Sequence, residues 1–460
     1  MAKKKEKTLE EKLQEALVPE NQWPYILPEN WCWTRLGKIT NVVGGGTPSS
    51  SKKEYYDNGT IPWLSPADLS GYSDIYISRG QKNITELGLS KSSARLMPKD
   101  TVLLSSRAPI GYVAIASNSI STNQGFKNFL PSDAFYSRFL YWYLKSSKSL
   151  LESYASGTTF LELSGSKASM VEFPLPPLPE QKRIVHRIES LFAKLDEAKE
   201  KIQQVLDGAE MRKASILHKA FTGELTKNWR KENGISEDSW VEYTLQSVCT
   251  MKITDGTHKT PTYSDKDNGV VFLSAKDITS GEINWENTKY ITSELHTELY
   301  SRLAPQINDI LLAKNGTTGV AALVKEDKVF DIYVTLALLR PDLEIVIPEY
   351  LLNIINSPIC KVQFNENLTG IGVPNLHLRD IKDVKIKVPS ISEQEIISDK
   401  VEMLLANEGM VTKNCLKQIE VIDTMKKSIL AKAFRGELGT NNPTEDSALN
   451  LLKEVLQDKF

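Results

Sequence analysis

Cysteine and histidine are scarce in this sequence of 460 residues, which holds four cysteines and five histidines. No two cysteines have Cys-x-x-Cys spacing, and too few histidines are present to complete a ligand set. We therefore expect neither a disulfide framework nor a zinc site, and a reducing, cytoplasmic setting. The cysteines are Cys32, Cys249, Cys360 and Cys415.

Long apolar runs are also missing. The first seven residues are mainly basic, but residues 8–17 follow as an amphipathic helix without an apolar run. This start predicts neither a signal peptide nor a membrane span.

A surplus of positive charge is absent as well, since the formal net charge is −2. Residues 28–178 carry 15 Lys and Arg against 11 Asp and Glu, whereas residues 240–390 carry 15 against 19. If either segment binds a polyanion, it must do so through a local patch.

Catalytic motifs are missing too. No Gly-x-x-x-x-Gly-Lys-Ser/Thr loop exists, the glycines 44–46 do not complete a dinucleotide-binding or methyl-donor loop, and the Asn/Asp-Pro-Pro-aromatic loop of amino-methylating enzymes is absent. Pro341-Asp342 with Asp383-Val384-Lys385 resembles a nuclease pattern, but one short enough to recur by chance. His218 and His258 have no nucleophile partner in the sequence, so we interpret both as surface residues.

The chain does contain a duplication. Residues 215–225 (SILHKAFTGEL) return as residues 428–438 (SILAKAFRGEL), with nine of eleven positions identical at an offset of 213. At the same offset Glu180-Gln181 aligns with Glu393-Gln394 and Glu189 with Glu402. A repeat this long, present twice, is typical of a duplicated half-protein and not of a solenoid array.

Apolar residues before each copy alternate spacings of four and three, which predicts a heptad seam. The first seam is Ile184, Ile188, Leu191, Leu195, Ala198, Ile202, Val205 and Ala209, and the second is Ile397, Val401, Leu404, Glu408, Val411, Cys415, Gln418 and Ile422. Prolines precede each helix, and Gly223 and Gly436 end them. A helix over 180–221 is about 63 Å long. The two polar seam positions favour one defined antiparallel pairing, although two independent helices, each on its own domain, remain an alternative.

The segments that precede the helices are weakly related to each other. Trp31-x-x-x-x-Leu36 aligns with Trp240-x-x-x-x-Leu245, and both segments hold short β-branched runs bounded by turn residues. Residues 136–151 and 348–356 are predicted to be helical. The predicted fold is α+β: two α/β domains separated by two long antiparallel helices that form a coiled coil, with pseudo-two-fold symmetry.

The predicted boundaries follow from these patterns. They are an N-terminal helical segment (1–27), a first domain (28–178), a first long helix (179–225), a linker (226–239), a second domain (240–390), a second long helix (391–438) and a tail with a short helix (439–460). We expect the helix at 8–17 and the helix near 448–456 to meet.

Four motifs resemble one family, the specificity subunits of Type I restriction-modification systems. They are the lead Pro174-Leu-Pro-Pro-Leu-Pro-Glu-Gln181, the doubled SILxKAFxGEL ending, Gly157-Thr-Thr159 and Trp63-Leu-Ser-Pro-x-Asp-Leu69. The resemblance covers essentially the whole chain, with the repeated helix ends as its most specific part. It implies two target-recognition domains that each read one half of an asymmetric bipartite DNA target, while the coiled coil sets the spacer.

The resemblance also implies that the chain is not catalytic and binds no cofactor itself. Its partners would be double-stranded DNA, two adenine methyltransferase subunits and, through them, restriction subunits. S-adenosylmethionine, ATP and Mg²⁺ would be bound by those partners. We also expect the repeated helix ends to present the same surface twice, once to each methyltransferase. The rival interpretations are a self-sufficient methyltransferase-nuclease and a scaffold with carbohydrate- or protein-binding heads.

DNA contacts are expected in loops with positive, hydroxyl or amide side chains. After equivalent strands, Arg107 suits guanine and Asn315 suits adenine. Arg107 as a structural ion-pair partner and Asn315-Gly316 as a turn are the alternatives. The full set of candidates is Thr47, Lys52, Lys53, Ser105, Ser106, Arg107, Lys127, Thr257, His258, Lys259, Lys276, Lys314 and Asn315.

Overall fold

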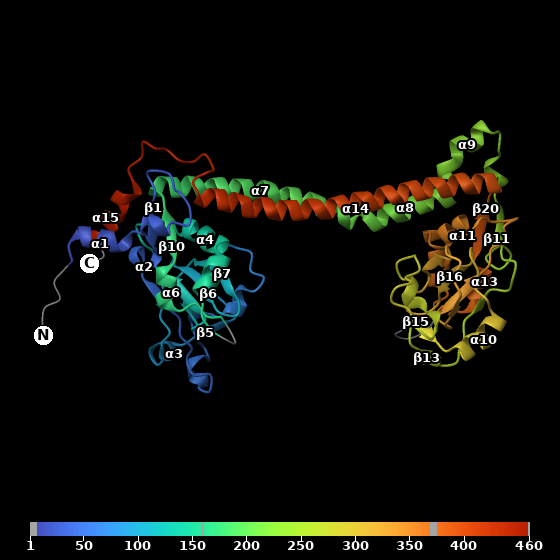
Figure 1. The fold of residues 1–460 in the computed structure, drawn as a ribbon, viewed down its shortest axis with the longest axis horizontal. Coiled ribbons are helices and arrows are strands. Elements are labelled where there is room, and N and C mark those ends of the chain that lie inside the picture. The colour runs from blue at the N-terminus through green and yellow to red at the C-terminus, as the bar shows by residue number, and fades with distance from the viewer. Residues whose placement is uncertain (1–6, 158–160, 369–374, 459–460) are drawn as a thin grey trace. The chain divides into compact units, whose positions relative to one another are not determined.

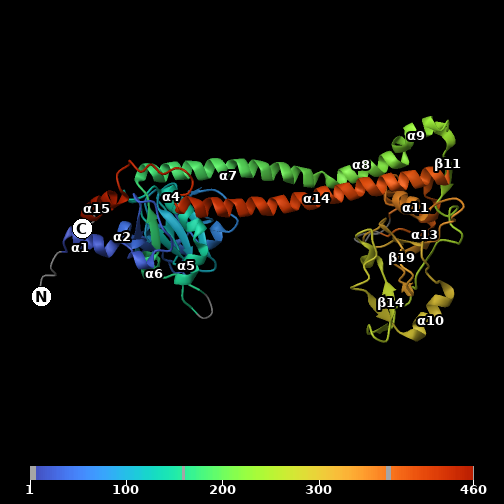
Figure 2. The ribbon, with the colours of Figure 1, turned by 45° about the horizontal axis from the view of Figure 1, so that its top comes forward.

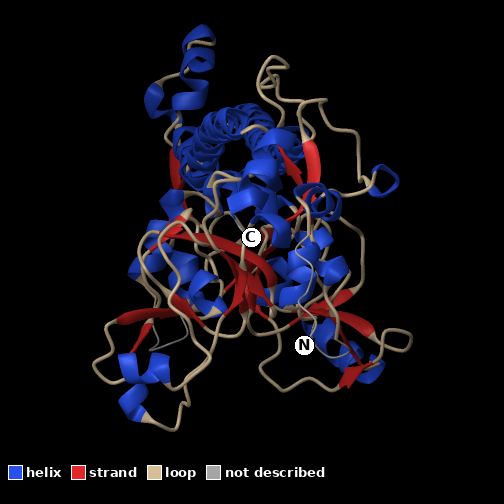
Figure 3. Ribbon diagram, turned by 90° about the vertical axis from the view of Figure 1, so that its left-hand side faces the viewer, coloured by secondary structure: helices blue, strands red, loops and turns tan. Residues whose placement is uncertain are grey.

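The computed structural model describes residues 7–157, 161–368 and 375–458. The chain forms two compact units (Figure 1): unit 1 holds residues 1–201 and 418–460, and unit 2 holds residues 202–417. Strands are short, and helices and loops make up most of the described chain (Figure 3). Thr158 and Thr159 of the predicted Gly-Thr-Thr motif lie outside the described residues.

Unit 1 contains a five-stranded, a three-stranded and a two-stranded sheet. Their orders are β2-β9-β6-β7-β4, β5-β3-β8 and β1-β10. The strands are β1 Cys32–Arg35, β2 Val42–Gly44, β3 Ile61–Leu64, β4 Tyr76–Ile77, β5 Lys82–Ile84, β6 Val102–Ser106, β7 Ile110–Ala116, β8 Ser121–Thr122, β9 Phe126–Phe129 and β10 Glu172–Leu175. The central strand β6 is buried along its whole length, as expected of a strand covered on both faces.

The helices of unit 1 cover the sheets and begin the long helical segment. They are α1 Leu9–Ala16, α2 Leu36–Ile39, α3 Glu86–Ser90, α4 Ser137–Ser146, α5 Lys148–Tyr154, α6 Gly165–Met170, α7 Leu178–Asp207 and α15 Ala448–Asp458. Helix α4 packs on β7, and α1 lies against α15 (Figure 2). The expected meeting of the first and last helices is therefore confirmed, because their apolar faces enter one core.

Unit 2 has three sheets whose strand orders follow those of unit 1, apart from one extra edge strand in each unit. They are β12-β19-β16-β17, β13-β15-β14-β18 and β11-β20. The strands are β11 Val241–Thr244, β12 Thr254–Asp255, β13 Tyr263–Ser264, β14 Val270–Leu273, β15 Lys289–Ile291, β16 Ile310–Ala313, β17 Ala321–Leu323, β18 Phe330–Ile332, β19 Leu336–Leu339 and β20 Lys385–Val388. The shared order, with an extra β13 in unit 2 and an extra β4 in unit 1, agrees with the weak relation between the two segments.

The helices of unit 2 are arranged around these sheets. They are α8 Ala209–Phe221, α9 Lys227–Glu232, α10 Ser293–Arg302, α11 Pro348–Ile355, α12 Pro358–Glu366 and α13 Leu378–Asp383. Helix α14, Ile391–Phe434, begins in unit 2 and ends in unit 1.

A buried glutamine fixes the start of each long helix to its unit. Gln181 accepts a hydrogen bond from the Tyr136 amide (2.8 Å) and donates to two main-chain carbonyls (3.0 Å each). Gln394 repeats this pattern, accepting from the Ile347 amide and donating to two carbonyls at 2.9 Å. Both side chains are fully buried, so all three bonds form away from water.

The glutamate that precedes each glutamine is also buried and receives an indole hydrogen bond. Trp31 donates to Glu180 (2.8 Å), and Trp240 donates to Glu393 (3.2 Å). Glu393 is further paired with Arg230 at 2.6 Å. Glu180 has no such close cation among the described residues. Burial raises the pKa of its carboxyl, and the hydrogen bonds that the carboxyl accepts only partly offset this shift. The duplicated Glu-Gln pair is therefore a helix-to-domain joint.

The repeated helix ends pack inward. In unit 2, Phe221 contacts Tyr350 edge to face at 5.1 Å, and in unit 1 Phe434 contacts Phe139 at 5.3 Å and Tyr143 at 5.1 Å. The buried positions of the two copies coincide: Leu217, Ala220 and Phe221 in one, Leu430, Ala433 and Phe434 in the other. The identity of these apolar residues thus reflects packing within each unit, so any surface that the repeats present to partners must come from their other, exposed positions.

The long helices run antiparallel where they meet within each unit. In unit 1, Lys199 bonds Asp423 at 2.9 Å, and Lys426 bonds Asp196. In unit 2, Arg212 bonds Glu408 at 3.0 Å, so the polar seam position is matched by a cation on α8. The predicted single helix over 180–221 is interrupted at Gly208, between α7 and α8.

Part of the predicted seam is wrong by one residue. Three seam positions are exposed, and the residue that follows each is more buried: Val205, Val411 and Gln418 give way to Leu206, Thr412 and Ile419. In the second helix, both registers share the heptad-spaced positions 401, 408, 415 and 422. The predicted and the observed seam differ only in the second set of positions, which lies three residues after the shared set in the prediction and four residues after it in the structure. Periodicity alone does not distinguish these two registers.

We predict that Gln394→Ala lowers the stability of unit 2 by about 3 kcal/mol, because it leaves a buried amide and two carbonyls without partners. Urea unfolding followed by circular dichroism would measure this. The exposed Gln418→Ala should change stability by less than about 0.5 kcal/mol. Equal effects of the two substitutions would contradict the role given to Gln394.

Candidate nucleic-acid interface

The same loop follows the central strand in both units. Arg107 forms an isolated bridge with Glu162, and Asn315 forms one with Asn375. The Leu163 amide donates to the Ser106 carbonyl, and the Leu376 amide donates to the Lys314 carbonyl, each at 2.9 Å. The alignment of residues 105–107 with residues 313–315 is therefore confirmed by their main-chain partners.

In unit 1 this loop covers a buried lysine. Lys127 is 7% exposed, and its Nζ lies 3.1 Å from Ser106 Oγ and 3.7 Å from Glu162 Oε1. Burial lowers the pKa of Lys127, and the Glu162 carboxylate opposes that shift. Arg107 lies 3.9 Å from the same carboxylate and keeps 38% of its side chain exposed.

Two candidate hydroxyl groups have no exposed surface. Ser105 Oγ donates to the Pro109 carbonyl and accepts from the Tyr112 amide, both at 2.8 Å. Ser106 is equally buried beneath Lys127. Ser105 and Ser106 therefore offer no surface to a ligand and instead hold the loop that carries Arg107. Burial also removes Lys127 from the exposed cations.

The loop over residues 45–53 is packed against its neighbours at Gly46. A Cβ on Gly46 would lie 2.2 Å from the Ala94 nitrogen, and the Gly46 carbonyl accepts from the Trp63 indole at 2.9 Å. Its outer residues stay available: Thr47 bonds Gln124 at the surface, and Lys52 and Lys53 are exposed.

In unit 2 the equivalent loop covers a second buried lysine. Lys314 is 7% exposed and forms an ion pair with the buried Asp255. His258 lies 3.3 Å from the same carboxylate but is 73% exposed, as predicted for a surface histidine. Thr257 is buried, and Lys259 pairs with Glu298 at the surface (3.0 Å). Lys314 and Thr257 are therefore structural residues.

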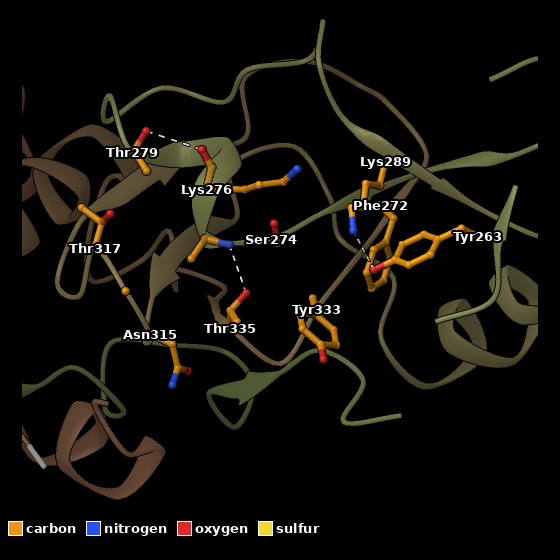
Figure 4. Close-up of a pocket in the computed structure, with 12 residues that line it drawn as sticks. Tyr263, Phe272, Ser274, Lys276, Thr279, Lys289, Asn315, Thr317, Tyr333 and Thr335 are labelled. Atoms are coloured by element: carbon orange, nitrogen blue, oxygen red, sulfur yellow. Dashed lines mark hydrogen bonds between the residues drawn. The ribbon is translucent and has the colours of Figure 1, made fainter. Parts of the chain in front are cut away.

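A pocket of about 390 Å³ in unit 2 brings Lys276 and Asn315 together (Figure 4). Its wall adds further residues with aromatic rings, hydroxyl groups and a second cation. They are Tyr263, Phe272, Ser274, Thr279, Lys289, Thr317, Tyr333 and Thr335. Ring faces, an amide and two ammonium groups together suit the faces and edges of bases and the phosphates of DNA.

Lys289 and Tyr263 are held together on neighbouring strands of the pocket. The ammonium group lies 4.2 Å from the Tyr263 ring centroid and donates to its hydroxyl at 3.2 Å (Figure 4). Strands β13 and β15 pair antiparallel, which brings the two residues side by side. A Tyr and a Lys 26 residues apart gave no sequence signal before that pairing was known.

Among residues 7–157, 161–368 and 375–458, no group of three potential metal ligands gathers. In those same ranges, no helix combines the length and apolarity needed to cross a membrane.

Comparison with known proteins identifies the family. Residues 28–207 and residues 237–421 match the family described as the Type I restriction modification DNA specificity domain. These ranges include most of the chain and all the site residues above, so the chain belongs to this family. The predicted membership among Type I specificity subunits is confirmed, as is its assignment to a class of non-catalytic DNA-recognition components.

Individual relatives agree. The chain is 24% identical over 450 residues to the EcoBI specificity subunit of Escherichia coli, covering 94% of this chain and 93% of that one. It is 42% identical over 205 residues to the MjaIX specificity subunit of Methanocaldococcus jannaschii, covering 44% of each chain.

Solved structures share the fold. The HsdS subunit from Thermoanaerobacter tengcongensis matches with a TM-score of 0.60 at 18% identity, covering 91% of this chain and 100% of that one. A chain from a structure on assembly of the type I R-M system matches with a TM-score of 0.66 at 19% identity, covering 90% and 100%.

We predict that Asp255→Ala destabilises unit 2 by about 3 kcal/mol, because removing one partner leaves the Lys314 charge buried without compensation. Thermal or urea unfolding would report the change. Lys259→Ala, which breaks only the exposed pair with Glu298, serves as the control and should cost less than about 1 kcal/mol. A full-stability Asp255→Ala protein would show that the buried pair does not support the loop.

Proposed function

We propose that this chain is the DNA-reading subunit of a Type I restriction-modification complex that acts in the cytoplasm. Each unit reads one half of an asymmetric bipartite target. The two long helices form a pseudo-two-fold coiled coil that sets the spacer and docks two adenine methyltransferase subunits, and through them restriction subunits. S-adenosylmethionine, ATP and Mg²⁺ are bound by those partners.

The observation that carries this proposal is the pair of equivalent loops with different side chains. Arg107 and Asn315 occupy the same bridged position in their units. An arginine pairs bidentately with guanine and an asparagine with adenine. Because the two positions differ, the two half-sites differ, and the target is asymmetric.

The charge distribution supports a division of labour with the partners. Two of the predicted cations, Lys127 and Lys314, are buried. The chain as a whole has a formal charge of −2. We propose that the methyltransferase subunits supply most of the phosphate contacts, so that the isolated chain binds DNA weakly and with a small salt dependence.

Exposed methionines on α14 support docking on the long helices. Met403 and Met410 are 57% and 58% exposed and lie one heptad apart, on one face. Exposed, adaptable apolar side chains of this kind mark surfaces that partners cover.

We predict that Asn315→Ala relaxes base preference at one position of one half-site, with a loss of about 1–3 kcal/mol of discrimination. Arg107→Ala should do the same in the other half-site. Methylation of a target library by the assembled methyltransferase would measure both. Lys259→Ala should leave base preference unchanged. Uniform loss across all positions would contradict a reading role for Arg107 and Asn315.

We further predict that one heptad inserted into the Ile184–Ala209 segment alone abolishes function or changes the spacer, with both half-site sequences kept. The reason is that the helix pairing, and not the recognition loops, sets the separation. Mapping of methylated adenines gives the spacer and half-sites together. Altered half-sites with an unchanged spacer would refute the assignment.

A further inference from the structure

Unit 2 has a cleft of about 670 Å³ beside α11 and α14. Its wall includes apolar side chains, Trp285 and Leu405 among them, together with five carboxylates and one lysine. The carboxylates are Glu282, Glu326, Glu349, Asp399 and Glu402, and the lysine is Lys325. Glu326 pairs with Lys328 at 2.7 Å, whereas the other four form no ion pair within the described residues.

Unit 1 provides an internal reference for this cleft. Helices α4 and α11 are equivalent, because Gln181 and Gln394 bind the amide just before each one. Counted from that amide, Glu349 takes the place of Arg138 and Asn353 takes the place of Trp142. On the long helices, Glu402 is the copy of Glu189, Leu405 the copy of Phe192 and Ser398 the copy of Val185.

In unit 1 the equivalent corner is filled and neutral. Arg138 pairs with Glu189 at 2.7 Å, and the Trp142 indole donates to the same carboxylate at 3.1 Å. The Trp142 ring also packs edge to face on Phe192 at 5.1 Å. A guanidinium and an indole N–H therefore bind the duplicated glutamate within the chain, and the Phe192 ring packs beside them.

In unit 2 those three groups are missing and the glutamate is retained. Glu349 puts a second negative charge where the arginine stood, and Asn353 and Leu405 leave the space of the rings open. Neighbouring carboxylates that form no ion pair destabilise the free chain, so Glu349 and Glu402 favour a cation from outside.

A second observation points to a ligand independently of the charges. Ser398, which lines the cleft, is 7% exposed, and its hydroxyl has no hydrogen-bond partner in the part of the chain that the structure describes. Its counterpart Val185 is apolar and packed in the core of unit 1. A buried hydroxyl without a partner costs free energy unless a ligand supplies one.

We infer that this cleft is a docking site for a segment of a partner protein that carries an arginine next to an aromatic side chain. The segment provides in trans what Arg138 and Trp142 provide within unit 1. Its guanidinium binds the carboxylates of Glu349 and Glu402, and its ring fills the space beside Leu405. DNA is excluded as the occupant, because its phosphates are repelled by the same carboxylates.

The inference rests on the proposal that the chain assembles with partner proteins, and it does not depend on which residues read DNA. It also assigns the two units unequal roles in assembly, since only unit 2 leaves this corner open.

The direct test uses the full chain and a labelled probe peptide. The probe is an alanine-based helical peptide with one arginine and, four residues later, one tryptophan, and its binding is measured by fluorescence anisotropy. The Glu349→Gln, Glu402→Gln double variant should bind the probe about tenfold more weakly, as expected for the loss of charge-assisted hydrogen bonds. A matched peptide with glutamate in place of arginine should not bind.

Three variant proteins separate docking from folding. The Glu349→Gln, Glu402→Gln protein should melt at or above the wild-type temperature, because it loses a repulsion, whereas Glu189→Gln should melt lower and bind the probe normally. Glu349→Arg with Asn353→Trp should fill the cleft and abolish probe binding. Equal binding of both peptides, unchanged binding by the filled variant, or a double variant that melts as low as Glu189→Gln would each overturn the inference. None of these outcomes involves DNA, so they stand apart from any failure of the half-site proposal.

Discussion

The structure depends on the joint between each recognition domain and the long helix that leaves it. A fully buried glutamine accepts one main-chain amide and donates to two carbonyls, in both units with the same partners. Because these bonds form away from water, a small change in helix direction would leave several groups unpaired. The neighbouring glutamate, held by an indole, adds a second fixed point. A domain held this firmly keeps the loop that we propose reads DNA in a defined orientation relative to the first turns of its helix.

Around this shared joint the two units have diverged in what their surfaces carry. The buried lysine under each loop comes from different strands, β9 in unit 1 and the end of β16 in unit 2, yet both are neutralised by a carboxylate. The exposed residue at the loop differs as well, arginine in one unit and asparagine in the other. The two units thus share the packing of the joint, while the side chains exposed at the loop differ.

Sequence reasoning was reliable where one pattern determines the structure. The doubled SILxKAFxGEL motif and the heptads located the long helices, and the glycines at 223 and 436, both with φ near +75° to +80°, end them as expected. It failed where the role of a residue depends on whether the fold buries its side chain. Ser105, Ser106, Lys127 and Lys314 have the side chains of a DNA surface, but the strand ends carry them inward. The sequence also gave no sign of Tyr333 in the pocket, because that wall is assembled from β13, β14, β15 and the segments 274–279, 315–317 and 333–335, which meet only in the fold.

We propose that one chain reads two different half-sites at a fixed separation. A genome-wide map of methylated adenines in cells with and without this protein tests this proposal. We expect one asymmetric motif that depends on the protein, with two specified parts separated by a constant number of unspecified base pairs. A continuous or palindromic motif, or a map that does not change when the protein is removed, would contradict it.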